Sequence, residues 1–380
     1  MEESAAAPDR GHSIVYAPRI QDLLAREEKV FRIDATTVGV SHCDLIADVV
    51  AARPVRSAER SVYKPAAGAD IPHDSATRTI RALGKDVMEG IRTPPPPARG
   101  LNGPWPYAAT SYLRQWLFAS DPLPVSLLSK RGITRSPALS RIVDRAVTVW
   151  PEPGGAGHGR TALAEQIRSA SDARERGQAI AMYRRATATL CDGVAALTGN
   201  ALWLMGPAGR EQLMGPAGRE QLMGRAGRKQ LMDSAGREHD VAGADLTAVL
   251  WETLRLLPPA WMLYRTGGDA YAGLHPEIRR EDNVALFPLL MHRHTDYWAE
   301  PMDFRPERWA GVPDPEKTPA FMPFGFDGAR CWAKHLVVPL AERLLTVALD
   351  NRLAVRVPNQ ETHVPLRSLL SVRFDARSGA

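Results

Sequence analysis

Apolar positions along the chain recur mostly at helical spacing. Leu45, Ile46, Val49 and Val50 form two adjacent apolar pairs, with the second pair four residues after the first. This spacing predicts an amphipathic helix that ends before Pro54. Similar patterns predict helices over residues 18–29, 75–91, 111–119 and 138–149, and a long Ala-rich helix over 162–205.

Short segments rich in β-branched and aromatic residues predict a few strands. Val30–Asp34 and Thr37–Ser41 are close enough along the chain to form a hairpin. Near the C-terminus, Arg352–Val357 and Leu369–Phe374 have the same composition. The fold class expected from these patterns is mainly α with small β-sheets. The length of 380 residues suits one large domain or two ordinary ones.

An internal repeat with a period of nine separates the long helix from the C-terminal third. GPAGREQLM occupies 206–214 and 215–223, GRAGRKQLM follows at 224–232, and the pattern decays over 233–241. Nine residues make 2.5 turns of α-helix, so successive copies would face opposite sides of a helix. The recurring glycines also disfavour a rigid helix. We interpret the repeat as a duplication tolerated on the surface, with a partner-binding device as the alternative.

Composition and charge exclude several classes of protein. Hydrophobic residues make up 44% of the chain and charged residues 24%, which excludes a wholly disordered protein. The net charge of +5 is spread over the whole chain, which argues against nucleic-acid binding. Three cysteines are too few and too scattered for a disulfide framework or a CxxC-type zinc site. No apolar run has signal-peptide or membrane length, so we expect a soluble, cytoplasmic protein that does not bind membranes.

One cysteine stands in a distinctive setting. Cys331 follows a glycine-bearing loop and precedes an apolar-periodic helix in FMPFGFDGARCWAKHLVVPL. Backbone N–H groups and the helix dipole favour a thiolate at a helix N-terminus, and glycine allows the backbone to approach a flat cofactor closely. A thiolate that binds haem iron favours cleavage of the O–O bond. Cys331 is therefore the candidate catalytic residue and metal ligand.

A charged pair precedes this cysteine in the sequence. Glu252 and Arg255 lie three residues apart in WETLRLL, so they share one face of a helix. Alone, such a pair is usually a solvated surface bridge. The apolar neighbours favour burial here, where the pair must be fully hydrogen-bonded. FRPERW supplies Arg308, which could complete a Glu–Arg–Arg network.

The order of these three motifs resembles the cytochrome P450 family: ExxR, then PER, then F-G…C near the C-terminus, at agreeing spacing. The resemblance is dense over residues 245–375 and diffuse upstream. It implies a cytochrome P450-type single large domain over residues 1–380. Residues 206–241 would then be an insertion between the oxygen-activation helix and the ExxR helix.

The resemblance also implies an activity. A haem-thiolate oxidase, most simply a monooxygenase, would bind haem b through Cys331 and activate dioxygen to oxidise a small organic substrate, free or carrier-bound. A ferredoxin-type redox partner would dock near Arg330 and Lys334. The Ala-, Arg- and Pro-rich composition suggests a bacterial source with a GC-rich genome, and hence secondary metabolism.

Several further residues match positions that bind haem in the family. Arg265 follows the ExxR helix and is a candidate contact to a haem propionate, and His292 is a weaker one. His73 and Arg78 resemble the family's HxxxR pair, with one residue too many between them. Arg81 or ordinary solvent-facing basic residues are therefore alternatives. The loop residues Phe324, Gly325 and Arg330 are the remaining candidate cofactor contacts.

The cysteine loop departs from the family's pattern. Gly328 and Arg330 each stand one residue closer to Cys331 than expected, and Ala329 occupies the place of the usual Arg or His. Ala333 replaces a glycine. Pro339 falls inside the following helix, which it should kink or interrupt.

The long helix departs as well. Counting back from Pro207 puts Leu190 and Cys191 where the family has its acid–alcohol pair. Four polar residues lie nearby without forming that pair: Thr187, Thr189, Asp192 and Thr198.

This departure motivates a second hypothesis: a haem-thiolate enzyme of coupling, peroxide-driven oxidation, dehydration or isomerisation. A third is a degenerate haem-binding module whose repeat docks a partner. Zinc binding is disfavoured because no second cysteine lies near Cys331 and His335 is more simply a residue of the helix surface. A Cys331 nucleophile with His335 or His292 as base is disfavoured because it leaves ExxR and PERW unexplained.

Overall fold

The chain was analysed as a computed structural model that describes residues 22–24, 26, 28–52, 73–118, 173–205, 245–265, 268–325, 330–356 and 375–378. The α-helices are α2 (Cys43–Ala52), α3 (His73–Arg92), α4 (Tyr107–Phe118), α8 (Ala173–Met205), α11 (Leu246–Leu256), α12 (Pro288–Met291) and α13 (Lys334–Asp350). The 3-10 helices are η2 (Ala98–Leu101), η4 (Gly268–Ala270), η5 (Pro306–Trp309) and η6 (Pro315–Lys317). The strands are β1 (Val30–Asp34), β2 (Thr37–Val40), β3 (Gly103–Pro104), β4 (Leu263–Arg265), β5 (Asn283–Leu286), β6 (Leu353–Arg356) and β7 (Asp375–Ser378).

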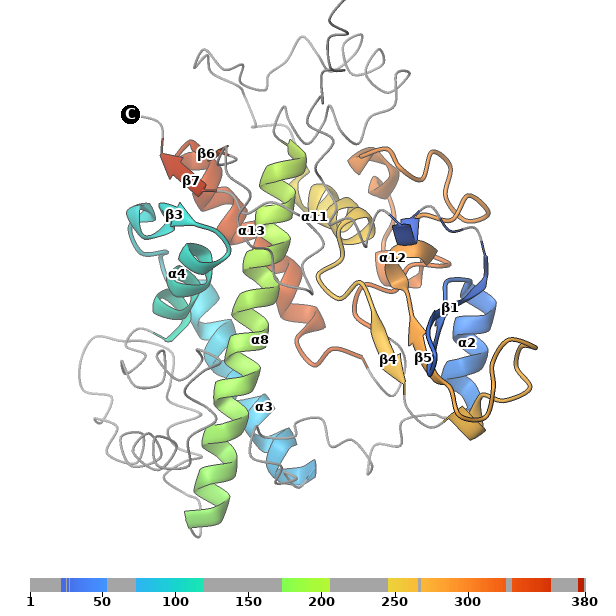
Figure 1. The fold of residues 1–380 in the computed structure, drawn as a ribbon. Helices are drawn as coiled ribbons and strands as arrows, with labels where there is room; N and C mark the ends of the chain where they lie inside the picture. Colours follow the sequence, from blue (N-terminus) through green and yellow to red (C-terminus); the bar gives the residue numbers. More distant parts are fainter. Residues whose placement is uncertain are drawn as a thin grey trace, which may run out of the picture.

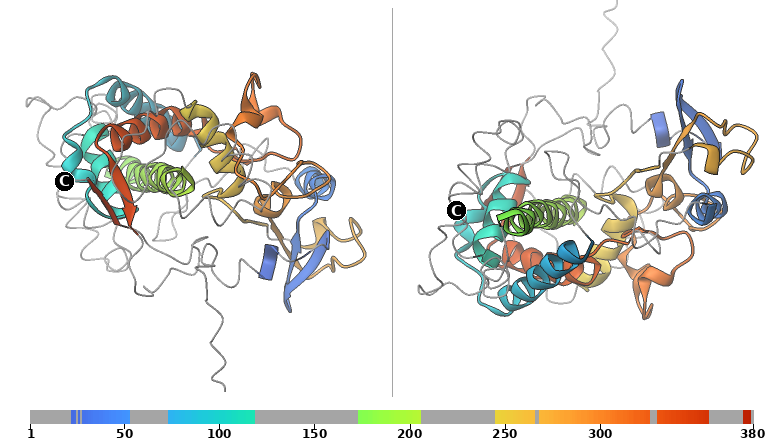
Figure 2. Two further views of the ribbon diagram at one scale, coloured as in Figure 1. Left: turned by 90° about the horizontal axis from the view of Figure 1, so that it is seen from above. Right: turned by 90° about the horizontal axis from the view of Figure 1, so that it is seen from below.

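Helix α8 runs through the middle of the molecule (Figure 1). It packs against α3, α4, α11 and α13, and these helices lie beside it when it is seen nearly end on (Figure 2). Its C-terminal half is buried on most of its circumference, from Ala186 to Met205. A helix that is apolar nearly all round must lie among other elements rather than on the surface.

A four-stranded sheet joins the N-terminal hairpin to strands from residues 263–286. Its strand order is β1-β2-β5-β4. The β1–β2 hairpin is antiparallel, as predicted. Strand β2 then pairs in parallel with β5, from Thr37 with Asn283 to Val40 with Leu286. Ile46 and Val49 of α2 belong to the apolar cluster that also contains the buried valines of β2, and α2 lies beside this sheet in Figure 1.

A second, three-stranded sheet has the order β3-β7-β6. Strand β6 confirms the strand predicted over 352–357. The strand predicted over 369–374 lies outside the described residues, and β7 begins at the next residue, Asp375.

Most predicted helices that fall on described residues are present. Helices α2 and α3 agree with the prediction, whereas α4 begins four residues earlier than predicted. The helix predicted over 18–29 extends too far, because residues 28 and 29 lead directly into β1. The helix predicted over 138–149 and the repeat at 206–241 lie outside the described residues, as does the start of the helix predicted over 162–205.

Helix α13 continues through Pro339. The expected interruption is therefore wrong, while a kink stays a prediction. Pro339 is exposed and stands in the second turn, so only the carbonyl of His335 loses its helical hydrogen bond.

The mainly helical architecture with two small sheets confirms the predicted fold class. Within the described parts of the chain, no helix combines the length and apolarity that crossing a bilayer requires.

Candidate functional site

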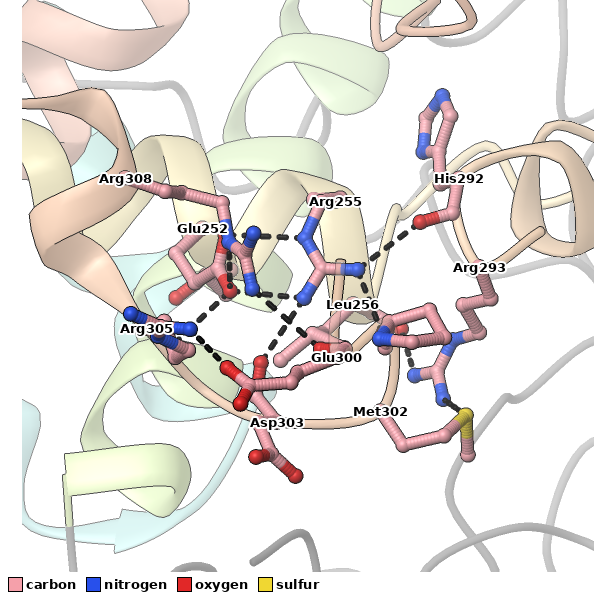
Figure 3. A network of polar contacts seen from close by, with 12 residues as sticks. Glu252, Arg255, Leu256, His292, Arg293, Glu300, Met302, Asp303, Arg305 and Arg308 are labelled. Atoms are coloured by element: carbon pink, nitrogen blue, oxygen red, sulfur yellow. Dashed lines mark hydrogen bonds and ion pairs between the residues drawn. The ribbon is translucent and has the colours of Figure 1, made fainter. Parts of the chain in front are cut away.

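A fully buried carboxylate organises the region between α11 and η5 (Figure 3). Oε1 of Glu252 accepts hydrogen bonds from Arg255 Nη2 at 2.7 Å and from Arg308 Nε at 3.1 Å. It also accepts from the backbone N–H of Arg305 at 2.9 Å. Oε2 accepts from Arg255 Nε at 3.0 Å and from Trp309 Nε1 at 2.9 Å. The structure therefore brings together Glu252, Arg255 and Arg308, the three residues that the sequence grouped.

Arg255 uses all of its N–H donors. Beyond its two bonds to Glu252, Nη1 donates to the carbonyls of His292 at 2.9 Å and Pro301 at 2.6 Å. Nη2 also donates to the carbonyl of Asp303 at 2.9 Å. A buried guanidinium is tolerated when its charge is paired and its five donors are satisfied. The network thus ties α11 to the irregular segment that leads into η5.

Arg308 is the least buried member of this network, with 14% of its side chain exposed. Burial lowers the pKa of Arg308, and the nearby positive charge of Arg255 acts in the same direction. The carboxylate of Glu252 opposes both effects. Glu252 therefore cannot balance the charge of Arg308 fully, because the same carboxylate also pairs with Arg255.

Sequence reasoning missed several members of this region. Trp309 follows PER directly and could have been found from that position. Arg293 is buried and donates to the carbonyl of Leu256 and, at 3.4 Å, to Met302 Sδ. Its adjacency to His292 was the only signal in the sequence.

The candidate ligand Cys331 is held by a short backbone connection. Its N–H donates to the carbonyl of Phe324 at 2.7 Å. Gly325 has φ +80°, a left-handed conformation that favours glycine. Phe324 is buried, and its ring lies 6.0 Å from that of Trp251, the neighbour of Glu252. The cysteine loop is therefore anchored to the same helix as the charged network.

The electrostatic setting of Cys331 differs from the expectation. Burial raises the pKa of the Cys331 thiol, and the negative charge of Glu316 adds to this effect. The N–H of Ala333 donates to the sulfur and lowers the pKa. The backbone thus favours the thiolate as expected, but burial outweighs it. A bound cation is what would stabilise the thiolate here.

Two of the predicted propionate contacts carry a buried nitrogen without a hydrogen bond among the described residues: Nε of Arg265 and Nδ1 of His292. Nε2 of His292 accepts the N–H of Met322 at 2.9 Å, so Nδ1 carries the proton of the neutral ring. Burial lowers the pKa of His292 to about 3. Nε of Arg265 is a donor without an acceptor, which suits a carboxylate of a bound cofactor. The ring of His292 also interacts with the backbone of Arg255 and Leu254, which partly opposes the lowering of its pKa. A thiol with a buried donor fits haem.

Three of the remaining candidates, Arg78, Arg81 and Arg330, are exposed. His73 is the first residue of α3, while Arg78 and Arg81 on the same helix are exposed. Arg330 is exposed and donates to Glu316 at 3.2 Å. Their contacts to a cofactor stay predictions.

The residues of α8 near the expected acid–alcohol pair differ in their burial and hydrogen bonding. Leu190 and Cys191 are buried in the main core cluster. Asp192 instead accepts a hydrogen bond from Thr110 of α4 at 3.1 Å. Thr187 and Thr198 are fully buried. The acid nearest to Cys191 is therefore engaged with α4.

Among the described residues, no group of three or more His, Cys, Asp or Glu side chains could hold a metal ion.

Comparison with known proteins identifies the site's family signature. Residues 246–331 match the family model for cytochrome P450. Cytochrome P450 3A15 of Cavia porcellus is 30% identical over 123 residues, which are 32% of this chain and 24% of that protein. Cyclooctatin synthase of Streptomyces melanosporofaciens is 31% identical over 84 residues, 22% of this chain and 18% of that protein. The matches thus span about a quarter or less of the relatives' length.

Solved structures extend the similarity over nearly the whole chain. A zebra fish cytochrome P450 with progesterone superposes with a TM-score of 0.55 at 16% identity, covering 95% of this chain and 98% of that one. The heme domain of a cytochrome P450DA mutant also gives 0.55, at 14% identity, covering 95% and 93%. The chain therefore has the cytochrome P450 fold, with the sequence signature of the cytochrome P450 family in residues 246–331.

Proposed function

We propose that this chain is a haem-thiolate oxidase of the cytochrome P450 type, a monooxygenase in which Cys331 is the axial ligand of haem b. The observation that carries the proposal is the connection of the buried Glu252–Arg255–Arg308 network to the Cys331 loop through α11, within a cytochrome P450 fold. Haem bound by a thiolate supplies the capacity to cleave the O–O bond of dioxygen.

The chain's own residues would bind and orient the cofactor. Arg265, whose Nε is buried without a hydrogen bond among the described residues, would donate to a haem propionate, and His292 is a weaker candidate for the same role. His73, Arg78 and Arg330 would add contacts at the rim. Phe324 and Gly325 would shape the loop that carries the ligand.

We also propose a single large domain over residues 1–380, with 206–241 as an insertion. The pairing of β2 with β5 and of β3 with β7 supports this organisation, because each joins distant parts of the chain. We propose a cytoplasmic bacterial protein that takes electrons from a ferredoxin-type partner and oxidises a small molecule, free or carrier-bound, in secondary metabolism. The match to cyclooctatin synthase of Streptomyces supports this setting.

The spectrum of the reduced, carbon-monoxide-treated protein tests haem binding through Cys331. The haem-loaded wild type should show the thiolate signature, and Cys331→His should bind haem without it. Thr346→Ala, on the exposed side of α13, is a matched control that keeps the ligand. A wild type that binds haem without the thiolate signature would contradict the proposal.

A second candidate function is haem-thiolate chemistry other than hydroxylation. The positions of Leu190 and Cys191, together with the bond from Thr110 to Asp192, favour it because α8 lacks the family's acid–alcohol pair there. Comparing turnover with NADPH, ferredoxin and its reductase against turnover with peroxide alone distinguishes the two. Turnover only with peroxide would favour the second function.

The third hypothesis, a binding module without turnover, depends on the repeat at 206–241, which lies outside the described residues. Excision of residues 215–232 removes two complete nine-residue copies. We expect turnover to persist after excision, and its loss with haem still bound would favour a docking role.

A further inference from the structure

A single carboxylate oxygen bridges the two cations that flank Cys331. Glu316 lies on η6, and its Oε2 accepts from Arg330 Nη1 at 3.2 Å and from Lys334 Nζ at 3.1 Å. Arg330 directly precedes Cys331, and Lys334 begins α13 three residues after it. The side chain of Glu316 is 21% exposed, less than either cation.

We propose that Glu316 forms a charge cluster with Arg330 and Lys334 whose net charge sets the reduction potential of the haem bound at Cys331, with the carboxylate lowering the potential and the two cations raising it. This inference rests on the proposed function. Neither the resemblance of the motifs nor their spacing singles out Glu316, which stands in a loop between PERW and the cysteine loop.

The geometry restrains where the positive charge lies. Because one oxygen accepts from both donors, the guanidinium and the ammonium are drawn to the same side of the cysteine loop. The backbone N–H of Lys334 donates to the carbonyl of Cys331 at 3.3 Å, so the cation is also tied to the ligand through the backbone. A movement of Glu316 would therefore move charge close to the ligand.

The charge balance predicts the direction of the effect. Reduction of the ferric haem takes one electron from the reduced partner, which is oxidised, and adds one negative charge beside Cys331. The two cations stabilise that charge and Glu316 opposes it. Partial burial of Glu316 limits screening by salt.

Potentiometric titration of the haem-loaded protein tests this inference, with dithionite as reductant. Glu316→Gln removes the negative charge and keeps the shape, so the potential should become more positive. We expect a change of up to about tenfold in the reduction equilibrium, which is about 59 mV for a one-electron couple. Glu316→Asp keeps the negative charge, so its reduction potential should lie nearer to that of the wild type than the potential of Glu316→Gln does.

Two further variants separate electrostatics from structural disturbance. Lys334→Gln should shift the potential in the negative direction, opposite to Glu316→Gln. The double variant with both substitutions should return toward the wild type, because it restores the original net charge. If the substitutions only loosened the loop, the reduction potential would shift in the same direction in both single variants, whichever charge is removed.

Asp314→Asn is the matched control. Asp314 precedes the same 3-10 turn and pairs with exposed Lys317 at 3.2 Å, so its loss should leave the potential unchanged. A wild type without the thiolate signature would overturn the proposed function and this inference with it. A normal wild-type spectrum with equal potentials in Glu316→Gln, Lys334→Gln and the wild type would overturn the inference alone.

Discussion

The carboxylate of Glu252 accepts five hydrogen bonds while its side chain has no exposure to solvent. Glu252→Gln would replace one acceptor oxygen by a donor and leave the buried charge of Arg255 unbalanced. We expect the free energy of unfolding to fall by about 3–5 kcal/mol, the usual cost of breaking a buried pair. Urea unfolding followed by circular dichroism measures it.

Glu307→Gln provides the control for that measurement. Glu307 pairs with Arg305 Nε at 2.8 Å, but 63% of its side chain is exposed. An exposed pair contributes little, so this variant should unfold like the wild type. Equal losses in the two variants would mean that burial of the network does not govern its contribution.

His292 makes stability depend on pH. Burial lowers its pKa from 6.5 to about 3 in the folded protein. The contribution of the neutral ring is therefore fully present above about pH 6.5 and is lost as the pH falls toward 3, because the unfolded chain then binds the proton more readily. At pH 5 the loss amounts to about 2 kcal/mol.

Unfolding of His292→Gln between pH 5 and 7 checks this prediction. The variant should be less stable at pH 7, because it disturbs the bond from Met322, and its stability should change less with pH. His335→Gln, at an exposed position of α13, should keep the wild-type dependence. An unchanged slope in His292→Gln would contradict the assignment.

Among individual site residues, the sequence predicted those whose spacing is fixed by a local motif. Glu252, Arg255 and Arg308 lie together as expected. The backbone partners of Arg255 at 292, 301 and 303 come from irregular loops, whose conformation has no periodic signal. Glu316 was not predicted from the sequence for the same reason. Its role depends on a loop that folds back toward Cys331.

Among the elements, α3 and α4 approach closely at one glycine. A Cβ added at Gly90 would lie 3.1 Å from Cα and Cδ2 of Leu117 and 3.3 Å from its carbonyl oxygen. At Gly84 of the same helix, a Cβ would meet nothing within 4 Å. The two glycines therefore offer a matched pair of substitutions.

Gly84→Ala should raise the free energy of unfolding by about 0.5–1 kcal/mol, because alanine costs less backbone entropy in a helix. Gly90→Ala gains the same entropy term but forces apart the backbones of α3 and α4, so its stability should fall below that of the wild type. Thermal unfolding of both variants measures the difference. If both substitutions raised the free energy of unfolding, α4 would be able to move away from residue 90 at little energetic cost.

The elements themselves were predictable where an apolar period was present. Helices α2 and α3 followed from that period. Strand β7 did not, because its sequence DARS lacks β-branched and aromatic residues. It pairs with β6 and β3, so tertiary pairing rather than propensity determines it.

Across the whole molecule, an ion pair joins the N-terminal hairpin to the segment before β5. Arg32 Nη1 and Nη2 donate to the two carboxylate oxygens of Asp282 at 2.7 and 2.8 Å. The hydrogen bonds from Arg32 lower the pKa of Asp282 despite burial. Their contribution is present above the usual pKa of 3.8 and is lost as the pH falls through the lowered value.

Asp282→Asn should lower the free energy of unfolding by about 1.5–3 kcal/mol, the range for hydrogen bonds to charged groups. Partly exposed Arg32 can recover some hydration, so the loss should be smaller than for Glu252→Gln. Chemical unfolding at pH 7 tests this, with exposed Glu281→Gln as control. A loss no larger than that of the control would show that the pair contributes nothing across the sheet.

The parallel pairing of β2 with β5 has a consequence for synthesis of the chain. All four residues of β2 are buried in the finished fold, yet β5 leaves the ribosome about 240 residues later, a delay of roughly 12–50 s at ordinary elongation rates. During that interval the hairpin presents an unpaired apolar edge to solvent. The nascent chain should therefore be most exposed to aggregation, and most dependent on chaperones, before its last hundred residues are made.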